Sequence, residues 1–112
     1  GLLINKTLQR DHNAVARAIS AQGAWSADGR SLSIRVSGLD RPATELVLRV
    51  NFERTGAEQV VRLRDIGGGW YEALWNRPAD DRWRAVLETD EWRLTMSSPA
   101  PGQVVRFAAD NP

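Results

Sequence analysis

Two periodic patterns of apolar residues divide the chain. In residues 2–19, apolar residues recur at spacings of 4, 7 and 4 among alanines and polar residues, which predicts an amphipathic helix. The expected apolar stripe of this helix consists of Ile4, Leu8, Val15 and Ile19. Glycine is a common helix stop, so we expect the helix to end near Gln22-Gly23.

From Trp25 onward, apolar and polar residues alternate with the period of a half-buried strand. Turn residues separate about seven or eight such segments at intervals of roughly ten residues. This pattern predicts a mainly β fold, an immunoglobulin-like antiparallel β-sandwich preceded by an N-terminal α-helix. We expect the helix over residues 1–22, the sandwich over 23–108 and a frayed tail over 109–112.

The run 67–96 holds four of the five tryptophans between turn residues. A tryptophan buries a large apolar area, so we expect Trp70, Trp75, Trp83 and Trp92 to serve packing and not chemistry. The positions that alternate inward predict the core, which consists of Leu32, Ile34, Leu48, Val50, Phe52, Trp83, Leu87, Trp92 and Leu94.

The composition indicates a single domain of ordinary polarity. Its 112 residues carry a net charge of +1, so no overall field attracts a polyanion such as nucleic acid. Fourteen of the 15 basic residues are Arg, and most of them alternate with apolar strand positions. There is no cysteine, which excludes disulfides, thiolate nucleophiles and thiolate metal sites.

The residues that could carry chemistry have simpler explanations. His12 is the only histidine, and its neighbour Asp11 diverges from it by about 100° on a helix. The pairs Asp80-Asp81 and Asp90-Glu91 are turn formers without the spacing of a calcium loop. Gly67-Gly68-Gly69 leads into a strand and is expected to connect a hairpin. We therefore expect no enzyme and assign no catalytic residue, cofactor or metal site.

The chain opens on apolar residues without an initiator Met, so we expect it to belong to a longer protein. Leu2, Leu3 and Ile4 form an apolar surplus at this end, which favours a contact with a partner or a membrane; packing on the sandwich is the alternative. In the isolated domain, these residues would be mobile or buried in a homodimer.

Three segments resemble the FixH family, also called CcoH. Residues 1–8 resemble the stretch that follows the membrane anchor in that family. Gly69-Trp70-Tyr71-Glu72-Ala73 resembles its G-x-Y hairpin, and residues 82–94 resemble its closing hairpin with two tryptophans. The resemblance covers about residues 2–96, and the stretch 99–112 has no counterpart in it.

The resemblance implies a single-pass inner-membrane protein with this domain in the periplasm. Such proteins assist the maturation of cbb3-type cytochrome c oxidase, together with a copper-transporting ATPase and other co-encoded assembly proteins. We therefore expect a non-catalytic interaction domain that contacts oxidase subunits or the ATPase. The alternative is a copper-handling domain, for which the chain offers only His12 and Met96 as soft ligands.

Overall fold

The computed structural model describes residues 2–97 and 104–110, with side chains from residue 5 onward. Its elements are α1 (Leu2–Ala16), β1 (Ser20–Trp25), β2 (Ser31–Ser37), β3 (Val47–Phe52), β4 (Glu58–Arg62), β5 (Arg64–Gly67), β6 (Trp70–Leu74), β7 (Trp83–Glu88), β8 (Arg93–Met96) and β9 (Val104–Ala108). The predicted class is confirmed: the fold is mainly β, an antiparallel sandwich preceded by one helix.

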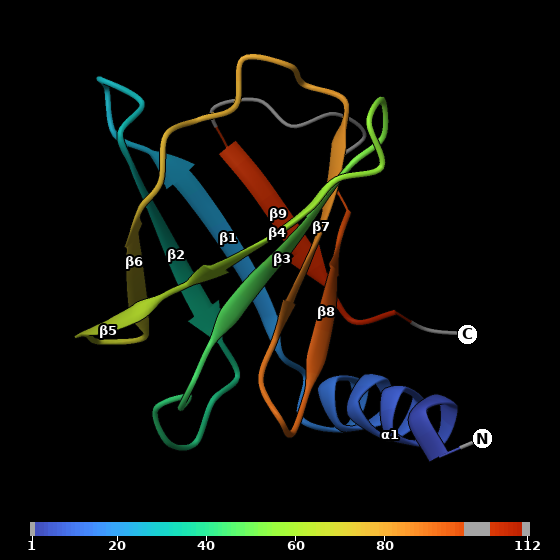
Figure 1. The fold of residues 1–112 in the computed structure, drawn as a ribbon. Coiled ribbons are helices and arrows are strands. Elements are labelled where there is room, and N and C mark those ends of the chain that lie inside the picture. The colour runs from blue at the N-terminus through green and yellow to red at the C-terminus, as the bar shows by residue number, and fades with distance from the viewer. Residues whose placement is uncertain (1, 98–103, 111–112) are drawn as a thin grey trace.

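The strands form one continuous antiparallel sheet in the order β4-β3-β7-β8-β9-β1-β2-β6-β5. The sheet folds over, so that its β4-β3-β7-β8 half faces its β9-β1-β2-β6-β5 half and the sandwich is nearly barrel-like (Figure 1). The two halves are joined where β9 pairs with β8 on one side and β1 on the other. Strand β9 lies beyond residue 96, where the family resemblance ends, and it is nevertheless an interior strand of the sheet.

The two edge strands are neighbours in the sequence. Only Leu63 separates β4 from β5, although these strands stand at opposite ends of the strand order. The Leu63 side chain is buried, and its amide donates to the Leu46 carbonyl over 2.9 Å. The chain thus passes from one half of the sheet to the other as a single extended run (Figure 1).

The core lies between the two halves and contains the residues that alternation placed inward. Leu32, Ile34, Leu48, Val50, Trp83, Leu87, Trp92 and Leu94 are buried, and Phe52 is half-buried and packs against them. Trp25, Trp75 and Trp83 form an aromatic trio with ring centroids 5.7–6.0 Å apart. The indole of Trp25 donates to the Trp75 carbonyl over 3.2 Å, which satisfies its buried N–H.

The helix ends earlier than predicted. Ala18 has a left-handed φ of 53°, its amide donates to the Val15 carbonyl, and the amide of Ile19 donates to the Ala14 carbonyl. This pattern is a Schellman motif with alanine where glycine is usual. The buried side chains of Ala14 and Ile19 supply the apolar contact that accompanies the motif.

The segment expected to end the helix is instead strand β1. It begins at Ser20, so the predicted domain boundary after residue 22 falls inside a strand. Gly23 does not stop a helix, because it lies between β9 and β2, where an added Cβ would stand 2.8 Å from Ile34 Cγ1. A glycine here permits the close approach of a neighbouring side chain.

Candidate functional site

From residue 5 onward, the face of α1 that packs on the sheet is mainly polar, which corrects the predicted apolar stripe at Leu8 and Val15. Asp11 and Ala14 are buried against the sheet, whereas Leu8 and Val15 remain 50% and 47% exposed. Ile19 is buried, but it lies beyond the helix. The helix lies beside the hairpin of β7 and β8 (Figure 1), so its contacts are with the polar residues at that end.

Ion pairs join α1 to this hairpin. Arg10 Nη1 lies 2.8 Å from Glu88 Oε2, and Arg93 Nη1 lies 3.2 Å from Asp11 Oδ1. At the end of the helix, Arg17 pairs with Glu91 over 3.1 Å. Charge-assisted hydrogen bonds thus add to the apolar contact of Ala14 in holding the helix on the sheet.

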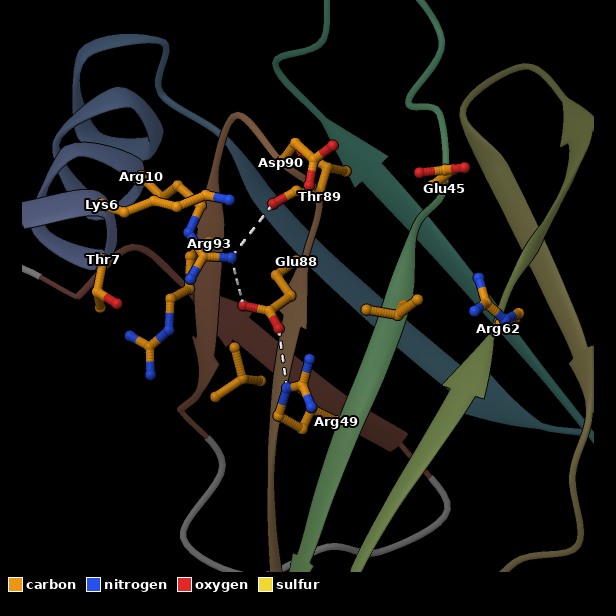
Figure 2. Close-up of a pocket in the computed structure, with 12 residues that line it drawn as sticks. Lys6, Thr7, Arg10, Glu45, Arg49, Arg62, Glu88, Thr89, Asp90 and Arg93 are labelled. Carbon is orange, nitrogen blue, oxygen red and sulfur yellow. Dashed lines mark hydrogen bonds and ion pairs between the residues drawn. The ribbon is translucent and has the colours of Figure 1, made fainter. Parts of the chain in front are cut away.

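Glu88 is the central group of this network. Figure 2 shows its carboxylate between Arg10 of α1 and Arg49 of β3, with Nε of Arg49 3.0 Å from Oε1. Arg10 also donates to the Thr89 carbonyl over 3.4 Å. The Glu88 side chain is almost fully buried, and both of its oxygens accept a charged donor. It therefore ties helix, β3 and β7 together.

A groove of about 520 Å³ opens along this network. Charged side chains make up most of its lining, and basic ones outnumber acidic ones: Lys6, Arg10, Arg49, Arg62, Arg93, Glu45, Glu88 and Asp90 (Figure 2). The ion pairs Arg10–Glu88, Arg49–Glu88 and Arg93–Asp11 already connect the elements on either side of the groove. We therefore assign these charged groups a structural role. The hydrogen bonds that Arg49 donates to Glu58 and to Glu88 raise the pKa of Arg49 above its ordinary value, and this guanidinium stays charged.

The outer face of β6 carries two exposed apolar side chains from the segment 67–96, which the sequence predicted to serve packing. Trp70 is 41% exposed, so the expected packing role for it is wrong. Leu74 is even more exposed, on the same face of the strand. Trp70 borders a shallow hollow over β1 and β9, whose walls include Arg35 and Arg106. Exposed tryptophans are enriched at protein interfaces.

The other candidates from the sequence serve local structure. The Asp80 carboxylate accepts the Arg82 amide over 2.9 Å, and that bond lowers the pKa of Asp80. In the turn at residues 89–92, the Thr89 hydroxyl accepts the amides of Glu91 and Trp92. The glycine triplet joins β5 to β6 with φ values of 97°, 63° and 83°, as a hairpin connection requires.

The two soft ligands considered for copper lie in different settings. His12 is exposed on α1, and Met96 is buried in β8 opposite Phe107. Among residues 2–97 and 104–110, no group of three or more His, Cys, Asp or Glu side chains is arranged so that it could hold a metal ion. No helix in the described part of the chain is long and apolar enough to cross a membrane.

The residues predicted to contact a partner begin α1. Leu2, Leu3 and Ile4 lie in its first turn, but their side chains fall outside what the structure describes. Of the expected tail, Ala109 packs against the core, and residues 111–112 also lie outside the described ranges. Comparisons with family models, curated proteins and solved structures found no match to the chain.

Proposed function

We propose that this domain is a non-catalytic interaction module of a membrane-anchored, FixH-like factor that assists the assembly of cbb3-type cytochrome c oxidase. In this proposal the domain lies in the periplasm and contacts oxidase subunits, the copper-transporting ATPase or other assembly proteins. The resemblance of residues 2–96 to that family supplies the choice of partners.

The polarity of α1 is the observation that carries the proposal. The helix is held to the sheet through Arg10, Asp11 and Ala14, while Leu8 and Val15 stay half exposed on its flank. Leu8 and Val15 are seven residues apart, so they lie on nearly the same side of the helix. A short helix that leaves apolar side chains in water has a surface suited to another protein or to a bilayer.

The membrane makes such a surface effective. In the family that the chain resembles, the segment corresponding to the start of α1 directly follows the anchor, so an anchor there would confine the helix to the membrane surface. Confinement raises the local concentration of partners, and a small apolar contact then suffices for binding. Leu2, Leu3 and Ile4 would extend this contact toward the bilayer.

Co-purification from native membranes tests the proposal. We expect the complete protein to retain oxidase subunits or co-encoded assembly proteins, and the variant Leu8→Ser/Val15→Ser to lose them at unchanged expression. Val104→Ser is the matched control, because Val104 is an exposed apolar residue on β9. Equal retention by the parent and both variants would refute a role for α1 in partner binding.

A copper titration separates the proposal from its alternative. A copper-handling domain would bind Cu(I) stoichiometrically and more tightly than about 1 μM, whereas an interaction module would show no such site. Calorimetry on the purified domain under reducing conditions distinguishes these results. A tight stoichiometric site would favour metal delivery over partner docking.

A further inference from the structure

The two free edges of the sheet differ in their ability to accept another strand. The β5 edge contains a register shift between Asp65 and Gly67, and the Gly67 amide is already occupied by the Asp65 carboxylate over 2.8 Å. Bulges and local bonds of this kind protect an edge from pairing. The β4 edge pairs with β3 in an unbroken register and has neither a bulge nor a proline.

Within residues 2–97 and 104–110, no strand pairs with the outer edge of β4, so part of its backbone faces away from the sheet. The amide of Phe52 donates to the Ala57 carbonyl, and the amide of Leu63 donates to the Leu46 carbonyl. These two pairs, which flank the β3–β4 ladder at its two ends, are therefore hydrogen-bonded pairs. Bonded and non-bonded pairs alternate in an antiparallel ladder. The N–H and C=O groups of Glu58, Val60 and Arg62 therefore point away from β3 toward solvent.

We propose that two copies of this chain pair antiparallel through β4 about a two-fold axis at Val60. Opposed in this register, Val60 faces Val60 of the second copy, and Glu58 faces Arg62 in both directions. All three outward-pointing positions then form bonded pairs, each of which exchanges two N–H···O=C bonds. The contact is isologous and closes with two subunits.

The side chains of β4 complement themselves in this arrangement. Glu58, Val60 and Arg62 lie on one face of the strand, and all three are exposed, with Val60 at 46%. The pairing buries the two valines against each other and sets each carboxylate opposite a guanidinium, which stabilises a strand pair. Because β4 has an acidic residue at one end and a basic residue at the other, an antiparallel copy of the same strand matches its charges. This complementarity indicates a second copy of the chain as the partner of the edge.

Charge reversal tests the pairing, although Glu58→Arg also removes the exposed ion pair between Glu58 and Arg49. Glu58→Arg and Arg62→Glu each place like charges opposite one another twice per dimer. Each variant should therefore weaken self-association by at least about tenfold. A one-to-one mixture of the two variants restores both opposite-charge pairs, so it should form heterodimers. Sedimentation velocity from about 1 μM to 1 mM measures these equilibria, and far-UV circular dichroism checks the fold.

A single cysteine gives an independent geometric readout. The chain has none, so Val60→Cys places one thiol at the two-fold axis. Its Cα should lie about 5.5 Å from the Cα of the second copy, within reach of a disulfide. We expect Val60→Cys to form a covalent dimer on mild oxidation far faster than Val104→Cys, an exposed control on β9.

Several results would overturn the proposal. These are a parent that stays monomeric to 1 mM, a mixture of the charge variants that does not associate, or equal crosslinking at positions 60 and 104. A dimer that survives both charge variants but is lost in Leu8→Ser/Val15→Ser would place the second copy on α1 and also refute it. None of these outcomes bears on capture of membrane partners, so this proposal and the proposed function fail separately.

Discussion

Replacing Glu88 with glutamine tests how strongly the sheet holds α1. Glutamine keeps the size of the side chain but removes the charge that Arg10 and Arg49 share over 2.8 and 3.0 Å. The side chain of Arg10 is only 19% exposed, and its Nε is buried without a hydrogen-bond partner among the described residues. The substitution therefore leaves one neutral amide oxygen where two carboxylate oxygens served two guanidinium groups, of which Arg10 is poorly solvated.

The magnitude follows from the burial of the two pairs. Removing one partner of a fully buried ion pair costs about 3–5 kcal/mol. Arg49 is 44% exposed and keeps its bond to Glu58, so its share is small. We expect Glu88→Gln to lower the free energy of unfolding by about 2–3 kcal/mol. Urea denaturation followed by tryptophan fluorescence measures this change.

Two comparisons make the result specific. Glu58→Gln removes an exposed pair with the same Arg49 and should cost less than about 1 kcal/mol. The double variant Glu88→Leu/Arg10→Leu removes both charges and should recover most of the stability that Glu88→Gln loses. If Glu88→Gln and Glu58→Gln cost the same, the buried network does not hold the helix.

Four further substitutions test other parts of the fold. Ala18→Gly should raise the free energy of unfolding by about 1 kcal/mol, because glycine adopts the left-handed φ of 53° without strain; a loss of stability would contradict this reading. Trp83→Ala should lower the free energy of unfolding by about 3–5 kcal/mol, and Trp70→Ala should lower it by less than about 1 kcal/mol. Equal melting temperatures of the two variants would refute the assignment of Trp83 to the core and Trp70 to the surface. Hydrogen bonds from the Ser26 hydroxyl and, second, from the Arg30 amide lower the pKa of Asp28 in the folded protein. The Asp28 carboxylate therefore stabilises the fold fully above about pH 4, which is the pKa of an unfolded Asp. This stabilisation is lost as the pH falls through the lower pKa of the folded state. The melting-temperature difference between parent and Asp28→Ala should accordingly shrink from pH 7 to pH 2, and a constant difference would count against this role.

Alternation was a reliable guide where the inward side chains are large. Leu32, Ile34, Leu48 and Val50 are buried because a strand in a two-layer fold buries every second residue. The same rule missed β1, whose inward positions include Ala21 and Gly23. Small residues give little hydrophobic contrast, and the close approach of Ile34 explains why they are needed.

The helix face could not be predicted from the sequence alone. Apolar spacing favoured Leu8 and Val15 as the packed residues, but the partners of Arg10 and Asp11 lie about 80 residues away, on β7 and β8. A buried charge is satisfied only by its tertiary partner, and nothing local indicates that such a partner exists. The exposed position of Trp70 was missed for a related reason, since alternation defines two faces but not which one meets the core.

Photocrosslinking from α1 in native membranes is the sharpest test of the proposed partner contact. A photoreactive amino acid at position 8 of the complete protein would stand on the exposed flank of the helix, and the same group at position 104 serves as the control on β9. We expect covalent products between position 8 and a cbb3-type oxidase subunit or a co-encoded assembly protein, in excess of any from position 104. Equal yields of such products from both positions, or their absence from position 8, would contradict it.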